Sequence, residues 1–304
     1  MINATATAAL QMPSAKRPFF KNILVATDFS PASEQAVEYA ASFARRYGSA
    51  IYLTHVVTLD GYPLISPEYA AMSLEKKHAE VQTHFGQILK SGELTGIRFK
   101  TVAKEGNLWP TIEESIKTFD IDLVVVGTHG AGTVEKMLIG SGAEEIFRKA
   151  KVPVLTIGPI TPKEPWQKME FKNILFATDF GKSAESEAEY AFSLAQEHRS
   201  RLTFLHVFPN PDAYGKEALI EMEHNFYAQL RELVPVATEM HCKVEVRVVF
   251  GEPTKQILRT AKETNAELIV MGAKARKSLA GNVPHTKAYR VVCEAHCPVL
   301  TIRS

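Results

Sequence analysis

Three glycines and a serine in the first half of the chain have the spacing of a phosphate-binding loop: Gly127, Gly130, Gly140 and Ser141. Gly127 and Gly130 follow an apolar run, where a glycine backbone can turn tightly and lie close to a ligand. Gly140 and Ser141 begin a predicted helix, whose unpaired N–H groups and positive dipole end favour a phosphate. The Ser141 hydroxyl adds a further donor. The spacing therefore predicts a phosphate-binding loop that joins a strand to a helix.

This glycine spacing differs from the best-known nucleotide loops. A chain with seventeen glycines contains a G-x-x-G about once by chance, and a third glycine at fixed spacing lowers that expectation to roughly one in twenty. The lysine of a Walker loop is missing, and the loop does not follow the first strand as a G-x-G-x-x-G does. The pattern favours holding a phosphate over transferring it. The alternative is a glycine-rich surface loop without a ligand.

A group of cysteine and histidine residues is the second candidate for chemistry. Cys293, His296 and Cys297 lie close together in the sequence, and Cys242 or His241 could complete four zinc ligands. Cys297, however, aligns with a strand-starting valine of the internal repeat described below, and a free cysteine commonly behaves as a small buried hydrophobe. We therefore predict no metal site there. No spacing supports a nucleophile with its base or a pair of catalytic carboxylates, so we predict no catalytic residues.

An internal repeat sets the organisation of the chain. Residues 21–30 (KNILVATDFS) return as residues 172–181 (KNILFATDFG), and residues 153–157 (PVLTI) return as residues 298–302. The offset is 151 residues for the first pair and 145 for the second, so the first copy has six extra residues in its middle. Loop-length differences of this size are tolerated.

Only the first copy keeps the glycine spacing. The positions matching Gly127, Gly130, Gly140 and Ser141 hold Gly272, Ala275, His285 and Thr286. Because Ala275 adds a methyl group where close approach is needed and His285 replaces the glycine at the helix start, we expect no ATP in the second copy. The same region is basic, and it is either a solvated loop or a site for another anion. Its basic residues are Lys274, Arg276, Lys277 and Lys287.

Length and composition indicate two ordinary domains. The chain has 304 residues, 45% apolar residues and 23% charged residues, which allow two hydrophobic cores. A formal net charge of +1 predicts neither a nucleic-acid partner nor a membrane surface, and no apolar run is long enough for a membrane span. Three cysteines cannot form a disulfide framework, which favours a reducing, cytoplasmic location.

Each copy alternates strand patterns with helix patterns. Ser30 and Pro31 read as an N-cap and the first residue of a helix. The predicted strands cover 22–27, 50–57, 97–104, 121–127 and 152–157 in the first copy, and 173–178, 201–208, 243–250, 267–272 and 298–303 in the second. Further helices are predicted over 67–90, 108–119 and 142–150. This alternation predicts an α/β fold in which each copy is a five-stranded parallel, doubly wound sheet flanked by helices.

The repeat also predicts domain boundaries. We expect a disordered tail over residues 1–16, a first domain over 17–158, a linker over 159–170 and a second domain over 171–304. The tail lacks the basic start and long apolar stretch of a secretion signal, and the linker is rich in prolines and charges.

Five motifs carry a family resemblance. They are K-N-I-L-x-A-T-D-F, L-x-H-V, D-L-V-V-V-G, the G-x2-G-x9-G-S spacing and V-P-V-L-T-I. Together they resemble the universal stress protein family of UspA type, in tandem form, from Lys21 to Arg303. The resemblance implies a Rossmann-like fold of the adenine nucleotide alpha hydrolase-like kind, ATP binding where the glycine spacing is kept, and pairing of the two domains through their last strands.

The resemblance also implies which residues bind the nucleotide. Ala26 and Asp28 would lie at the end of the first strand, with Asp28 near the ribose or a bound metal. Val56 would meet the adenine through its backbone. The residues expected around the ribose and the phosphates are Val126, Gly127, Gly130, Gly140, Ser141 and Gly142.

Two pairs of polar residues occur in both copies. Asp28 has a counterpart in Asp179, so its carboxylate serves ligand contact, turn formation or both. His55 and His206 end the second strand of each copy, where a histidine is more often packed and hydrogen-bonded than catalytic.

We therefore expect a tandem universal stress protein whose first domain binds ATP, or else ADP or AMP, as a nucleotide-responsive stress-response module. Mg²⁺ or Mn²⁺ is the metal that could accompany the nucleotide. The two alternatives are a slow metal-dependent ATPase at the same site and a nucleotide-free structural or partner-binding protein. The sequence favours binding and supports at most a weak ATPase; a further homodimer is compatible with it.

Overall fold

The computed structural model describes residues 20–58, 67–128, 139–158, 160–162, 170–235, 242–273 and 286–303. In the first half the elements are β1 (Asn22–Ala26), α1 (Pro31–Tyr47), β2 (Ala50–Val57), α2 (Pro67–Lys90), β3 (Arg98–Glu105), α3 (Leu108–Thr118), β4 (Leu123–Gly127), α4 (Ser141–Lys149) and β5 (Val154–Ile157). In the second half they are β6 (Asn173–Thr178), α5 (Ala184–His198), β7 (Arg201–Phe208), the short 3-10 helix η2 (Pro211–Ala213), α6 (Lys216–Leu233), β8 (Val244–Phe250), α7 (Pro253–Glu263), β9 (Leu268–Gly272), α8 (Lys287–Glu294) and β10 (Val299–Ile302).

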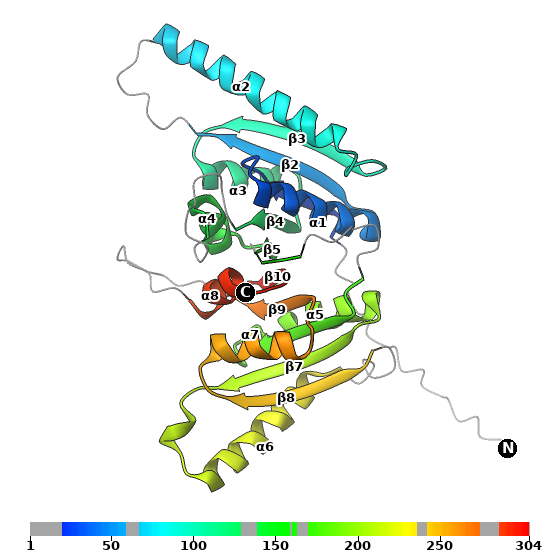
Figure 1. Ribbon diagram of the computed structural model, residues 1–304, viewed down its shortest axis with the longest axis vertical. Helices are drawn as coiled ribbons and strands as arrows, with labels where there is room; N and C mark the ends of the chain where they lie inside the picture. Colours follow the sequence, from blue (N-terminus) through cyan, green and yellow to red (C-terminus); the bar gives the residue numbers. More distant parts are fainter. Residues whose placement is uncertain are drawn as a thin grey trace, which may run out of the picture.

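These elements form one ten-stranded sheet with helices on its faces (Figure 1). The strand order is β3-β2-β1-β4-β5-β10-β9-β6-β7-β8. Within each half all strand pairs are parallel, which confirms the predicted α/β class and the doubly wound order. The predicted strands and helices agree with the described ones to within two residues at each end. The six extra residues of the first copy fall between β2 and β3, where α2 has 24 residues and its counterpart α6 has 18.

Local sequence explains the start and the end of α1. Ser30 is the N-cap, and its hydroxyl accepts a hydrogen bond from the Ser33 N–H at 3.3 Å. Pro31 occupies the first helical position, where its missing N–H costs nothing. The helix ends at Gly48, which adopts the left-handed conformation with φ 69°. Both predicted signals, the cap and the proline, are confirmed.

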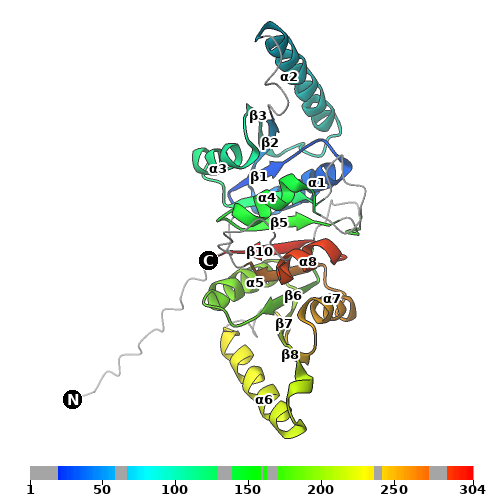
Figure 2. The ribbon, with the colours of Figure 1, turned by 90° about the vertical axis from the view of Figure 1, so that its left-hand side faces the viewer.

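The two halves join through their last strands, as the family resemblance implied. β5 and β10 pair antiparallel, with Leu155 opposite Leu300, and they lie side by side at the centre of the molecule (Figure 2). These two leucines occupy matching positions of the repeat, so a pseudo-twofold axis passes between them. Both are fully buried in one hydrophobic core that draws residues from both halves, among them Phe43 of α1 and Leu194 of α5. Pairing removes two exposed sheet edges that could otherwise bind another chain.

Helices α1 and α5 meet on the same axis at their carboxyl ends. Arg46 lies 3.6 Å from the carboxylate of Glu197, the residue at the matching position of the repeat. The Tyr47 hydroxyl lies 3.1 Å from Nε2 of His198, and His198 is the residue that matches Tyr47 in the repeat. Burial and the nearby Arg46 charge lower the pKa of His198 to about 4, so this ring is neutral at neutral pH.

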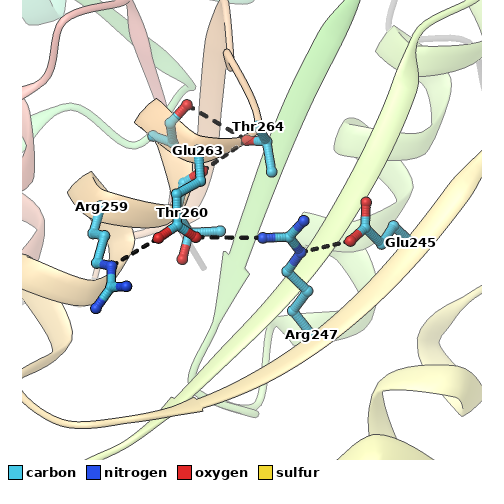
Figure 3. Close-up of polar contacts among 7 residues, drawn as sticks. Glu245, Arg247, Arg259, Thr260, Glu263 and Thr264 are labelled. Atoms are coloured by element: carbon cyan, nitrogen blue, oxygen red, sulfur yellow. Dashed lines mark hydrogen bonds and ion pairs between the residues drawn. The ribbon is translucent and has the colours of Figure 1, made fainter.

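A chain of ion pairs ties the edge strand β8 to α7 (Figure 3). Arg247 Nε lies 2.6 Å from Glu245 on the same strand, and Arg247 Nη1 lies 3.5 Å from Glu263 on α7. Glu263 also pairs with Arg259 at 2.7 Å. These side chains are partly exposed, so each pair contributes at most about 1 kcal/mol. Their charges also disfavour pairing of this edge with another strand.

Three expectations fall largely outside the described residues. The tail over residues 1–16 is not described, and of the linker over 159–170 only residues 160–162 and 170 are. The basic residues Lys274, Arg276 and Lys277 are likewise not described. None of the helices in the described ranges combines the length and apolar character that crossing a bilayer requires.

Candidate functional site

A cavity of about 530 Å³ lies at the carboxyl ends of β1, β2 and β4, beside the start of α4. This is the point where the strand order of the first half reverses, and ligands bind there in open parallel sheets. Eight of the predicted site residues line it: Ala26, Asp28, Val56, Val126, Gly127, Gly140, Ser141 and Gly142. The ninth, Gly130, lies outside the described residues.

The turn from β1 to α1 is built around Asp28. Its Oδ1 accepts a hydrogen bond from the Ser30 N–H at 3.0 Å, and Phe29 between them has a positive φ of 62°. In the second half Asp179 Oδ1 accepts from the Gly181 N–H at 3.1 Å. The aspartate therefore forms the same turn in both halves. Asp28 is exposed and also lines the cavity, so turn formation and ligand contact are compatible.

His55 supports this turn from the neighbouring strand. Its Nδ1 lies 2.8 Å from the Thr27 carbonyl oxygen, and its ring stacks on Phe29 with centroids 4.6 Å apart. Burial lowers the pKa of His55, against the opposing effects of the Thr27 hydrogen bond and the Asp28 charge. His206 makes the matching contact to its own half, 2.9 Å from the Thr178 carbonyl oxygen. The packed, hydrogen-bonded arrangement agrees with the structural role that the sequence predicted.

Gly127 is required by close packing at the end of β4. A Cβ atom there would lie 2.4 Å from the carbonyl oxygen of Ala32 at the start of α1, closer than real Cβ contacts allow. The next residue, Thr128, donates from its N–H to the Ile157 carbonyl at 3.0 Å. The Thr128 carbonyl in turn accepts from the Gly140 N–H, so the two ends of the glycine loop are joined by a backbone hydrogen bond. This bond holds the start of α4 beside the end of β4.

The start of α4 presents backbone donors to the cavity. Gly140 is its N-cap residue, and a glycine has no side chain with which to cap the helix. The first three helical residues are Ser141, Gly142 and Ala143, and all three line the cavity. N–H groups at these positions have no partner within the helix, and the helix dipole adds partial positive charge. Gly142 is also tightly placed, because a Cβ there would lie 3.0 Å from a methyl group of Leu108.

The rest of the cavity wall is mostly apolar. Leu108 and Ile112 of α3, Ile146 of α4, and Val56 and Val126 of the sheet all line it. The cavity thus combines an apolar wall with a group of backbone donors and one carboxylate, a combination typical of small-molecule sites. We had not predicted Leu108, Ile112, Ile146 or the hydroxyl of Ser33. The only signal of Leu108, Ile112 and Ile146 in the sequence is the apolar period of α3 and α4, which also describes ordinary core residues, and Ser33 has no signal beyond its place in the first turn of α1.

A second cavity of about 380 Å³ occupies the matching place in the second half. Ala177, Asp179, Val207 and Gly272 line it at the positions of Ala26, Asp28, Val56 and Gly127. The start of α8 differs from that of α4, because the Thr286 hydroxyl accepts a hydrogen bond from the Tyr289 N–H at 3.2 Å and caps the helix. Lys287 is the first residue of α8, where α4 has Gly142. Ala275 and His285, which motivated the expected loss of ATP, lie outside the described residues.

The cysteines are buried, free thiols. Burial raises the pKa of Cys293 to about 11 and that of Cys297 to about 12. In the described part of the chain no three histidine, cysteine or acidic side chains come together as a metal site.

Comparison with known proteins places this geometry in a family. The sequence model described as the universal stress protein family matches residues 19–158 and again residues 170–303. A universal stress protein of Mycolicibacterium smegmatis is 26% identical over 290 residues, covering 92% of this chain and 96% of that protein. Universal stress protein A of Salmonella typhimurium is 35% identical over 148 residues, covering 48% of this chain and 98% of that protein. The crystal structure of a universal stress protein from Archaeoglobus fulgidus has a TM-score of 0.64 at 23% identity, covers 95% of this chain and 99% of its own, and shares the fold.

Proposed function

The chain belongs to the universal stress protein family, with two tandem copies of its domain, and from this premise we propose that the first copy binds one adenine nucleotide. The nucleotide would be ATP, ADP or AMP. The single observation that carries the proposal is the cavity itself, in which an apolar wall faces the start of α4, where Gly140 at the N-cap position provides no side-chain cap. The apolar wall suits a purine ring, and the backbone donors suit phosphate oxygens.

We propose roles for the remaining residues from the family resemblance, which their place in the cavity supports. Val56 is the penultimate residue of β2, and its backbone groups would bond the edge of the base. Asp28 offers a carboxylate to the ribose hydroxyls, or to a Mg²⁺ or Mn²⁺ ion carried by the phosphates. Mg²⁺ commonly binds one or two protein carboxylates together with substrate phosphates, so a single aspartate would be enough. Gly127 serves the packing of α1 against the end of β4, and the proposed Gly130 would let the backbone approach the phosphates.

The same residues favour binding over hydrolysis. A general base would have to lie within hydrogen-bond reach of the attacking water. Asp28 is the one carboxylate that the described residues contribute to the cavity, and the proposal uses it for the ribose or a metal, while His55 Nδ1 is held by the Thr27 carbonyl. We therefore propose a nucleotide-responsive binding module in which domain 1 spans residues 17–158 and domain 2 spans residues 171–304. Slow ATP hydrolysis with a metal near Asp28 is the alternative that the test below separates.

The first experiment identifies the ligand that the protein carries. Protein purified from cells is denatured, and the released nucleotide is identified and quantified by mass spectrometry. One adenine nucleotide per chain is the expected result. Two per chain would require the second cavity as well, and none, combined with no binding of added nucleotide, would refute the proposal. Incubation of the bound ATP with Mg²⁺ or Mn²⁺ then separates binding from turnover, because a binding module leaves ATP intact.

The second experiment tests the place of binding by calorimetry. Gly140→His imitates the second copy of the repeat and puts a side chain at the start of α4, so ATP binding should be lost. Gly86→His is the matched control, because Gly86 lies on α2 away from the cavity and a Cβ there would meet no atom within 4 Å. Equal ATP affinity in the Gly140→His and Gly86→His proteins would show that the loop has been misinterpreted.

A further inference from the structure

The second cavity keeps one side of the first cavity and changes the other. Ala177, Asp179, Val207 and Gly272 repeat the residues that end the strands around the first cavity. The apolar wall is also repeated, with Ile257 at the position of Ile112. The changes lie at the first turns of α5 and α8, the two helices that border the opposite side. What the second cavity can bind is decided by those changes.

Glu187 of α5 places a carboxylate in the wall of the second cavity. Its side chain is buried, with 6% of the residue exposed, and Ser183 Oγ donates to its Oε1 at 2.5 Å. The carboxylate lies directly over Gly272, since a Cβ added there would meet Glu187 Oε1 at 2.2 Å. The first half has the small apolar Ala36 at the matching position. The first cavity instead has Ser33 in its wall, whose hydroxyl donates to the Ser30 carbonyl at 2.9 Å.

The difference in α5 has a local cause. The first helix begins at Pro31 after the Ser30 cap, whereas the second has Gly181 and Lys182 at these positions and begins only at Ala184. The backbone of Ala32 is the group nearest to a Cβ added at Gly127, whereas at Gly272 the nearest group is the side chain of Glu187. The carboxylate of Glu187, one turn further along, fills the space over Gly272.

The start of α8 keeps the backbone donors of the start of α4. The Thr286 hydroxyl caps the Tyr289 N–H, and the N–H at the matching position of α4, that of Glu144, is likewise bonded, to the Gly140 carbonyl. Thr286, Lys287 and Ala288 line the second cavity as Ser141, Gly142 and Ala143 line the first, so the difference in what the two cavities bind rests on Glu187. Lys287 adds a positive charge to this wall. The second cavity therefore combines the carboxylates of Asp179 and Glu187 with one ammonium group, and these groups can bond a ligand that has both donors and acceptors.

We propose that the second cavity binds an uncharged nucleoside, with adenosine as its representative, and excludes the phosphorylated forms. The inference rests on the proposed function of the first cavity, because matching positions are used to place the base and the ribose. Ribose hydroxyls donate to Asp179 and Glu187, which as carboxylates only accept, and Leu205, Val207 and Met271 pack against the base. A phosphate near Glu187 would bring two negative charges together in a largely buried space.

Met271 makes the proposal testable without reference to the first site. It lies on β9 with 6% of the residue exposed and lines the second cavity, while the first cavity has Val126 at that position. The full-length protein, stripped of nucleotide and labelled at its methionine methyl groups with ¹³C, is titrated by NMR. Met271→Leu assigns the signal. Adenosine should shift the Met271 signal in a saturable way, and ATP at the same concentrations should leave it unchanged.

Two variants test the role of the carboxylate. Glu187→Gln keeps the shape and removes the charge, and Glu187→Ala copies the first half of the chain. Either should allow ATP to shift the Met271 signal, with an affinity increased at least about tenfold over the wild type. An ATP shift in the wild-type protein at or below the adenosine concentration, or no response to adenosine, would overturn the proposal. Continued exclusion of ATP from both variants would overturn the part assigned to Glu187. A first cavity that fails to bind ATP would be seen by calorimetry and would leave these Met271 readings valid.

Discussion

A matched pair of substitutions tests the different helix starts of the two halves. Ser141→Ala and Thr286→Ala each remove one hydroxyl from the first turn of a matching helix, α4 or α8. The Thr286 hydroxyl accepts a hydrogen bond from the Tyr289 N–H at 3.2 Å and therefore caps its helix. Ser141 is the first helical residue of α4 and lines the proposed nucleotide site, where we expect its hydroxyl to bond a phosphate. The two alanines should therefore affect different properties of the protein.

The expected magnitudes follow from these roles. Loss of an N-cap hydroxyl lowers the free energy of unfolding by about 1 kcal/mol, so Thr286→Ala should lower it by this amount. It should leave ATP affinity unchanged. Ser141→Ala should change the free energy of unfolding by less than about 0.5 kcal/mol. It removes one hydrogen bond to a charged phosphate, about 1.5 to 3 kcal/mol, so the Kd for ATP should rise about 10-fold to 150-fold.

Two measurements on the same preparations decide the outcome. Urea unfolding gives the change in stability, and calorimetry with ATP gives the change in affinity. If Ser141→Ala loses as much stability as Thr286→Ala and keeps full ATP affinity, then the two helix starts are equivalent. The contrast between an uncapped α4 and a capped α8 would then carry no functional meaning.

Three further predictions concern packing, pH and the pairing of the two halves. Gly127→Ala should destabilise the fold or abolish it, because its Cβ would lie 2.4 Å from a backbone oxygen. Gly86→Ala, near the carboxyl end of α2 where a Cβ would meet no atom within 4 Å, should instead raise the free energy of unfolding by up to about 1 kcal/mol, and urea unfolding of both variants compares them. His198 has a pKa lowered to about 4 in the folded protein, so the unfolded chain binds the proton more readily. The free energy of unfolding should therefore fall by about 3 kcal/mol in total as the pH falls from about 6.5 towards 4. His198→Asn should flatten this part of a plot of stability against pH, and an unchanged plot would contradict the assignment. Arg46→Glu should destabilise the pairing of the halves by up to about 1 kcal/mol, because the ion pair of Arg46 with Glu197 is partly exposed. Combining Arg46→Glu with Glu197→Arg should recover part of this loss in a double-mutant cycle. No recovery would mean that the two side chains are not energetically coupled.

Much of the fold was predictable because the relevant signals are local. The β-branched runs, the Ser30–Pro31 helix start and the repeat of K-N-I-L each depend on residues close in the sequence. The pairing of β5 with β10 followed from the family resemblance and is confirmed by the antiparallel register around Leu155 and Leu300. The glycine spacing and the same resemblance named eight residues that the structure places around one cavity.

The rest depended on contacts between segments that are distant in the sequence. Leu108 and Ile112 look like ordinary core residues until α3 is packed beside α4. The contact between Tyr47 and His198 depends on the pseudo-twofold axis, which brings these two matching positions of the repeat together.

By itself, the sequence determined the two tandem α/β domains, their order of elements and which half of the chain has an intact glycine loop. It could do so because periodicity and glycine spacing depend on residues that are close together in the sequence. Tertiary structure alone decided that a buried Glu187 stands over Gly272 and that Thr286 caps α8 while the start of α4 has no side-chain cap of its own. The physical reason is that the charge and the free donors of a cavity depend on which side chains of separate helices share the space. Local patterns do not specify that arrangement.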